Sequence, residues 1–226
     1  CIDFRTGTRG AILARLCGAP RRLGFFATDE PAWRNPLFTD LVRREYQRGT
    51  HVADYYFELV KWLGIANRDP EPRLTVPAKV VQAVSVRLQD MGVDNRQPFV
   101  ALQPFSLWPY KELPADTYVD LVEQIGKRCG RPIVIVGAAA ERPRAQAIVK
   151  RCRVSTVNMA GQTSIGQLAG LLGLARMFVG VDSAGLHIAA AVGTPTIGVF
   201  GPTDPLSWAP RGRRHTVIQP RMPCVP

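Results

Sequence analysis

From residue 99 onward, short apolar runs alternate with longer segments whose apolar residues recur every three or four positions. Such runs predict buried strands, and the recurring spacing predicts amphipathic helices. The predicted strands are 99–102, 133–136, 154–158, 178–181 and 196–200, and the predicted helices are 116–128, 142–151, 164–172 and 185–192. Strands that alternate with helices form right-handed crossovers and a parallel sheet. This pattern predicts an α/β, Rossmann-like domain.

The first 98 residues show a sparser pattern. The predicted strands here are 1–4 and 23–26, the predicted helices are 10–16 and 51–63, and 27–50 is expected to be irregular. These elements are too few for a complete domain. Residues 66–77 hold three prolines and four charges, a linker composition, and a helix is expected over 80–91.

We therefore expect three parts: 1–75 as the C-terminal part of an N-terminal domain, 76–98 as a linker with a connecting helix, and 99–226 as a nucleotide-binding domain. The chain starts inside a predicted strand and ends in a loop over 222–226, without a closing helix. We expect a chain that is cut at both ends.

Charge and composition narrow the possible partners. The formal net charge is +11, but the basic clusters are not interleaved with aromatic residues, so nucleic-acid binding is not expected. Two interpretations stay open: ordinary surface charge, or attraction to an anionic substrate or membrane surface. No apolar run approaches the ~20 residues of a membrane-spanning helix, so a membrane role would be peripheral. Five widely spaced cysteines without zinc spacing favour a reduced, cytosolic setting.

Residues 177–210 hold the first candidate site. A buried strand ends at Asp182, and a helix of small residues follows. That helix opens with Ser183, Ala184 and Gly185. Its first backbone N–H groups lack intrahelical acceptors and can hold a phosphate. Asp182 is suited to accept hydrogen bonds from a sugar hydroxyl or to cap the helix together with Ser183. His187 is either a buried, hydrogen-bonded histidine or a ligand contact.

Three more loops follow predicted strands and so open on the same sheet edge. Lys111 and Ser106 lie in the loop 103–114, where the lysine is suited to neutralise a phosphate leaving group or is an ordinary surface residue. Ser106 can add a hydroxyl group that donates to the sugar-nucleotide donor. Glu141 is placed to hold ribose hydroxyls. Thr163 and Ser164 could line a base pocket, although Ser164 is equally suited to cap a helix. No dinucleotide fingerprint, Walker A loop or clustered metal ligands occur, so we expect no metal.

Together these segments resemble the ADP-heptose:lipopolysaccharide heptosyltransferases of glycosyltransferase family nine. The resemblance rests on Val181-Asp182-Ser183-Ala184-Gly185-Leu186-His187, Phe200-Gly201-Pro202-Thr203-Asp204-Pro205, Lys111-Glu112-Leu113-Pro114 and Ala160-Gly161-Gln162-Thr163-Ser164. It implies a GT-B fold of two Rossmann-like domains and metal-independent transfer, with inversion, of heptose from ADP-heptose to the lipopolysaccharide inner core. It further implies no cofactor beyond the donor, an anionic glycolipid acceptor, and work at the cytoplasmic face of the inner membrane.

The resemblance also implies residue roles. Lys111 would meet the donor phosphates, the backbone of 183–185 the pyrophosphate, Asp182 the sugar, Glu141 the ribose and Thr163 the adenine, while His187 fits the motif without an assigned role.

The chain departs from the family at three points. Ala184 stands where the family often has Gly, and Leu113 replaces the usual Trp. The family's acidic general base belongs to a Gly-rich turn that would precede Cys1, so the base is expected outside this chain. Alternatives stay open: another GT-B transferase or an epimerase with a different nucleotide sugar, or a nucleotide-binding fragment without catalysis.

Overall fold

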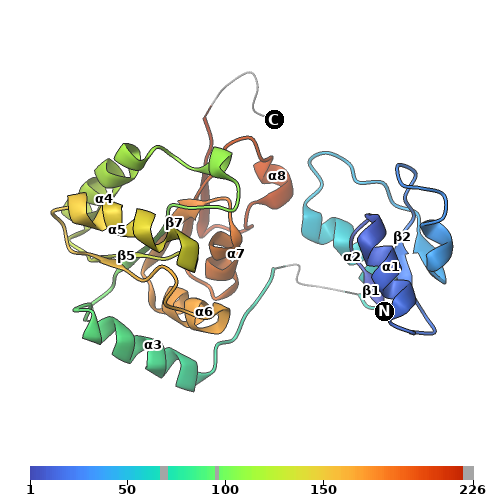
Figure 1. Ribbon diagram of the computed structural model, residues 1–226, viewed down its shortest axis with the longest axis horizontal. Coiled ribbons are helices and arrows are strands. Elements are labelled where there is room, and N and C mark those ends of the chain that lie inside the picture. Colours follow the sequence, from blue (N-terminus) through green and yellow to red (C-terminus); the bar gives the residue numbers. More distant parts are fainter. Residues whose placement is uncertain (67–70, 95–96, 221–226) are drawn as a thin grey trace. The chain divides into compact units, whose positions relative to one another are not determined.

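The computed structural model of the chain describes residues 1–66, 71–94 and 97–220 (Figure 1). It divides into two compact units, Cys1–Pro70 with Leu206–Trp208, and Glu71–Pro205 with Ala209–Pro226. Each unit is built on its own parallel sheet. The domain limits that the sequence suggests at residues 75 and 98 remain a prediction. The expected terminal loop over 222–226 lies outside the described residues.

The larger unit holds a six-stranded parallel sheet in the order β6-β5-β4-β7-β8-β9. Its strands are β4 Val100–Gln103, β5 Ile133–Ile135, β6 Thr156–Asn158, β7 Met177–Val181, β8 Thr196–Val199 and β9 His215–Ile218. The sequence predicts the first five. It misses β9, because His215-Thr216-Val217-Ile218 contains no run of apolar residues and follows four residues of which three are arginines.

Helices cover both faces of this sheet (Figure 1). They are α3 Ala78–Asp90, α4 Ala115–Cys129, α5 Arg142–Arg151, α6 Ile165–Leu174 and α7 Ala184–Ala191. The short helix α8 Pro205–Trp208 is not among them, because Leu206–Trp208 group with the smaller unit. Side chains alternate along a strand. In β4, Val100 and Leu102 therefore pack with α4 and α5, whereas Ala101 packs with α3, α6 and α7. The unit is a three-layer α/β/α sandwich.

The strand order places a topological switch between β4 and β7. From β4 the chain moves to β5 and β6 on one side, and it returns to β7 on the other side of β4. The two strands pair in parallel, with Gln103 opposite Gly180. In open α/β sheets, ligands bind at the carboxyl ends of strands at such a switch. The loops after β4 and β7 therefore border the expected crevice.

The smaller unit holds three parallel strands in the order β1-β2-β3. Its elements are β1 Ile2–Asp3, α1 Thr8–Leu16, β2 Leu23–Phe25, the 3-10 turn η1 Asn35–Leu37, β3 Asp40–Val42 and α2 Val52–Trp62. The prediction that residues 27–50 are irregular is wrong for β3. This strand has only three residues and no polar–apolar alternation, and it is defined by its pairing with β2, which a local pattern cannot reveal.

A buried arginine ties the loops of this unit together. Arg34 has no solvent exposure, and its guanidinium donates to the backbone oxygens of Phe25 at 2.9 Å and Arg5 at 3.1 Å. Burial lowers the pKa of Arg34. Beside it, the rings of Phe25 and Tyr55 stack with centroids 4.2 Å apart. The unit therefore combines small apolar clusters with a polar network.

Candidate functional site

Two charged residues from distant parts of the sequence meet at the switch between β4 and β7. Lys111 lies in the 3-10 turn η2 Pro109–Lys111, and Asp182 directly follows β7. Lys111 Nζ and Asp182 Oδ2 are 2.5 Å apart, and the side chains are 15% and 7% exposed. A charge removed from water to this degree is costly unless it is paired. Each residue thus holds the other in place at the carboxyl edge.

The start of α7 carries no side-chain cap. Ser183 occupies the N-cap position with extended backbone, but its side chain accepts no capping hydrogen bond. The expectation that the oxygens of Asp182 and Ser183 start this helix is therefore wrong, because the Asp182 carboxylate pairs with Lys111 instead. The first helical N–H groups remain available to an anion. His187 is exposed on α7, so the alternative of a buried histidine is also wrong.

Gln103 is not among the site residues predicted from the sequence, but its side chain lies against the start of α7. A Cβ atom at Gly185 would lie 1.7 Å from Gln103 Oε1, so a larger residue at 185 would displace the Gln103 side chain. Within the described residues, Gln103 Oε1 and Ser183 Oγ are buried and have no hydrogen-bond partner. Buried polar atoms are normally partnered. Two orphaned atoms beside an uncapped helix fit a ligand rich in hydroxyl groups. The sequence does hold a signal for Gln103, because it is a polar residue at the end of an apolar strand.

The loop that carries Lys111 is clamped by Glu112 and Arg144. The Glu112 side chain is 5% exposed, accepts from the backbone N of Ser106 at 3.0 Å, and forms an ion pair with Arg144. The Arg144 guanidinium in turn lies 4.3 Å from the centroid of the Phe105 ring. Its hydrogen bond with Glu112 raises the pKa of Arg144. The sequence predicts that Ser106 contacts the sugar-nucleotide donor. In the structure, its backbone N–H is part of the clamp, because it donates to Glu112.

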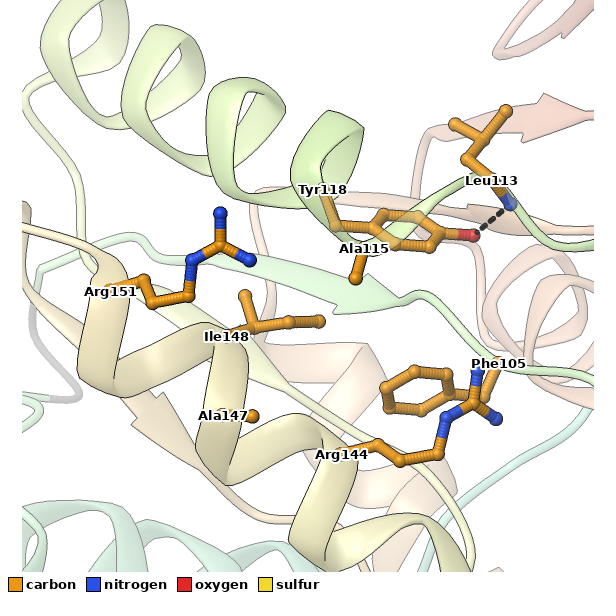
Figure 2. A pocket seen from close by; sticks show the side chains of 8 residues that line it. All are labelled: Phe105, Leu113, Ala115, Tyr118, Arg144, Ala147, Ile148 and Arg151. Atoms are coloured by element: carbon orange, nitrogen blue, oxygen red, sulfur yellow. Dashed lines mark hydrogen bonds between the residues drawn. The ribbon is translucent and has the colours of Figure 1, made fainter.

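Tyr118 of α4 fastens the same loop from behind. Its hydroxyl donates to Pro104 O at 2.5 Å and accepts from Leu113 N at 3.0 Å. Figure 2 shows Tyr118 and Leu113 at the edge of a small apolar hollow between α4 and α5. The hollow has a volume of about 150 Å³, and Phe105 and Arg144 form its opposite wall. Both ends of the Lys111 loop are therefore anchored.

Glu141, Thr163 and Ser164 form a second group, on the turns after β5 and β6. Glu141 Oε2 accepts from Ala138 N at 2.7 Å. Ser164 Oγ accepts from Gln167 N at 3.2 Å and so caps α6, as one reading of the sequence predicted. The two turns touch: a Cβ at Gly161 would lie 2.5 Å from the Cα of Ala139.

The whole chain, residues 1–226, matches the protein family described as glycosyltransferase family 9 (heptosyltransferase). The chain belongs to glycosyltransferase family 9. Lipopolysaccharide heptosyltransferase 1 of Pseudomonas aeruginosa is 30% identical over 100% of the chain and 60% of that protein. Lipopolysaccharide heptosyltransferase 3 of Escherichia coli K12 is 28% identical over 72% of the chain and 47% of that protein. The chain thus spans between 47% and 60% of the length of these two relatives.

Solved structures of family 9 members share the fold. The glycosyltransferase of Veillonella parvula superposes with a TM-score of 0.84 at 20% identity, covering 97% of this chain and 62% of that one. E. coli heptosyltransferase WaaC with ADP-2-deoxy-2-fluoro heptose superposes with a TM-score of 0.69 at 21% identity, covering 99% and 65%. These likenesses confirm the predicted α/β fold with parallel sheets of the GT-B type.

In the described parts of this family 9 chain, no helix is both long and apolar enough to cross a membrane. Among the same residues, no three or more His, Cys, Asp or Glu side chains gather as they would around a metal ion.

The Tyr118 anchor leads to a prediction about stability at high pH. Burial raises the pKa of Tyr118 from 10.0 to about 12, so the folded protein favours the neutral phenol. The stability that the neutral, buried phenol contributes to the fold is fully present below pH 10, and it is lost as the pH rises through about 12. We expect the stability advantage of the wild type over Tyr118→Phe to fall by about 2 kcal/mol across that window. Urea unfolding of both proteins at several pH values measures it, and an unchanged difference would contradict the assignment.

Proposed function

We propose that this protein transfers a heptose from ADP-heptose to the lipopolysaccharide inner core, with inversion and without a metal ion or other cofactor. The observation that carries the proposal is the Lys111–Asp182 pair at the β4–β7 switch, beside the uncapped start of α7, in a family 9 chain. The relatives named above are heptosyltransferases, and the solved WaaC structure holds an ADP-heptose analogue. Both support a donor of this class.

When the donor binds, the Lys111 ammonium would leave Asp182 and pair with the donor phosphates. The amides of 183–185 would hold the pyrophosphate, and Lys111 would stabilise the charge that grows on the departing ADP. Asp182 would then be free to accept hydrogen bonds from the heptose hydroxyls. The orphaned Gln103 Oε1 and Ser183 Oγ supply two more partners for the sugar nucleotide. His187 lies on the exposed side of α7, and we assign it no chemical role.

The nucleoside half of the donor would lie toward the turns after β5 and β6. Glu141 keeps one oxygen on the Ala138 amide and offers the other to the ribose. Thr163 would border the adenine. Ser164 serves this region as the cap of α6. This arrangement uses the whole carboxyl edge from β6 to β7 for one extended ligand.

The acceptor side completes the reaction. A general base, which the resemblance predicts to be an acidic residue, would deprotonate the acceptor hydroxyl, which attacks the anomeric carbon as the bond to ADP breaks. The acceptor is an anionic glycolipid, and the net charge of +11 favours its approach and a peripheral contact with the cytoplasmic face of the inner membrane.

A transfer assay with a panel of nucleotide sugars tests this function. ADP-heptose, a UDP-sugar and a GDP-sugar are each supplied with the inner-core acceptor, and products are followed by mass spectrometry. We expect a mass gain of one heptose from ADP-heptose alone. Transfer from another nucleotide sugar, epimerisation of the donor, or binding without turnover would each overturn the proposal in favour of a named alternative.

The Glu112 clamp gives a prediction within this function. Glu112→Gln keeps an acceptor for Ser106 N but loses the ion pair to Arg144, so Lys111 should be less well positioned. We expect kcat/KM for ADP-heptose to fall by about 10-fold, since small misplacements of a charge donor are costly. Glu123→Gln is the matched control, because Glu123 also accepts from backbone amides, those of Arg153 and Val154. Equal kcat/KM in the two variants would contradict a positioning role.

A further inference from the structure

Beside the Lys111–Asp182 pair, a loop presents aromatic side chains to solvent. Trp108 is 53% exposed and Tyr110 is 63% exposed. Their ring centroids are 5.9 Å apart and the rings are inclined by 32°, so the two rings pack against each other at the surface. Burying such side chains elsewhere would stabilise the fold, and exposed apolar patches mark binding surfaces. We refer to these two rings as the aromatic platform.

The backbone beneath the aromatic platform is fixed. Lys111 N donates to Trp108 O at 3.0 Å, and Glu112 N donates to Pro109 O at 3.0 Å. Trp108 N donates to Ser106 Oγ at 3.3 Å. The anchors at Glu112 and Tyr118 hold the two ends of the loop, as described above. Rings on a fixed backbone lose little conformational freedom when a ligand binds, so they are suited to recognition.

The aromatic platform adjoins the proposed donor site. Tyr110 immediately precedes Lys111, whose ammonium contacts Asp182. The carbonyl oxygen of Tyr110 lies 3.7 Å from the position of a Cβ at Gly201, so the turn also touches the loop after β8. A ligand that extends from the donor sugar toward these rings would meet charge at one end and two aromatic faces at the other.

A sugar ring has the matching chemistry. One face of a pyranose presents several C–H groups, whose positive hydrogens are attracted to the negative faces of aromatic rings. The hydroxyls of the same sugar point outward and remain available to water. The donor heptose and phosphates already account for Asp182, Lys111 and the amides of α7. The second sugar that the reaction needs, which supplies the nucleophilic hydroxyl, must lie next to the donor heptose.

We propose that the aromatic platform of Trp108 and Tyr110 stacks against the acceptor sugar and thereby sets acceptor specificity. The proposal rests on the function proposed above, and it concerns binding of the acceptor, not of the donor. Stacking on a sugar requires the two aromatic rings, and an exposed aliphatic side chain cannot replace them. The neighbouring Leu107, which is 86% exposed, therefore offers a matched comparison on the same loop.

Steady-state kinetics separates these roles. With a water-soluble inner-core saccharide freed of fatty acids, Trp108→Ala should raise the acceptor KM about 10-fold, the order of effect of removing a stacking ring. Tyr110→Ala should do the same, Trp108→Phe should restore most of the affinity, and Leu107→Ala should match the wild type. The KM for ADP-heptose should stay unchanged in all four. A parallel rise of both KM values, or an equal effect of Leu107→Ala, would overturn the proposal.

Direct binding distinguishes a wrong site from a wrong function. Trp108 fluorescence, taken as the difference between wild type and Trp108→Phe, should change when the saccharide is added without any donor. If the wild type shows this change but transfers nothing from ADP-heptose, the proposed function fails and the aromatic platform stands. If the fluorescence responds only to phosphatidylglycerol vesicles, and Leu107→Ala abolishes that response, the loop is a membrane contact and the platform is wrong.

Discussion

Replacing Lys111 by Met is expected to lower kcat for heptose transfer by about 10²- to 10³-fold, the cost of removing one preorganised charge donor from a developing oxyanion. The structure gives the reason: Lys111 is held on a clamped turn at the β4–β7 switch, and its ammonium is 2.5 Å from Asp182. Met keeps the apolar stem, so the packing of the turn is largely preserved. Single-turnover measurements with saturating ADP-heptose report the effect on chemistry.

A control is needed because Lys111→Met leaves the Asp182 carboxylate without its partner. Loss of one partner of a buried ion pair costs about 3–5 kcal/mol of stability, so folding must be measured alongside activity. The double variant Lys111→Met/Asp182→Asn removes both charges and should regain stability without regaining kcat. Lys127→Met, which breaks the ion pair of the exposed Lys127 with Glu123, should leave kcat unchanged. A folded Lys111→Met protein with near wild-type kcat would remove Lys111 from the site.

The second large effect is expected from Asp182→Asn. The substitution keeps the shape of the side chain but loses a charged acceptor for sugar hydroxyls, a type of hydrogen bond that contributes about 1.5–3 kcal/mol. Binding of ADP-heptose should therefore weaken by about 10- to 100-fold, whereas binding of ADP, which lacks the sugar, should change much less. Isothermal titration of both ligands into the same preparation measures the two affinities. Equal losses would mean that Asp182 acts through Lys111 and not on the sugar.

Much of the larger unit follows from local pattern. Strands of parallel sheets are buried on both faces and read as apolar runs, which is why β4, β5, β7 and β8 are found within one or two residues of their predicted positions. The helices between them are found because their apolar residues recur every three or four positions. β3 and β9 are missed because each mixes polar with apolar residues and contains no apolar run, so only its pairing with a neighbouring strand defines it.

The site was predictable in its parts but not in its connections. Asp182 and Lys111 each follow a predicted strand, so their place on one sheet edge could be expected. Their pairing depends on β4 lying next to β7, which no pattern within either segment encodes. The ion pair of Glu112 with Arg144 joins residues 32 positions apart and has no local signal either. Sequence reasoning finds residues with suitable chemistry, and the tertiary structure decides which of them act together.

The most direct test of the donor site is a crystal structure of the protein with ADP-heptose. We predict that a phosphate oxygen lies within hydrogen-bond distance of the amides of residues 183–185 and that Lys111 Nζ has moved from Asp182 to that phosphate. Asp182 should then accept from a heptose hydroxyl. A nucleotide sugar bound elsewhere, or a Lys111–Asp182 pair that stays intact with the donor in place, would contradict the account.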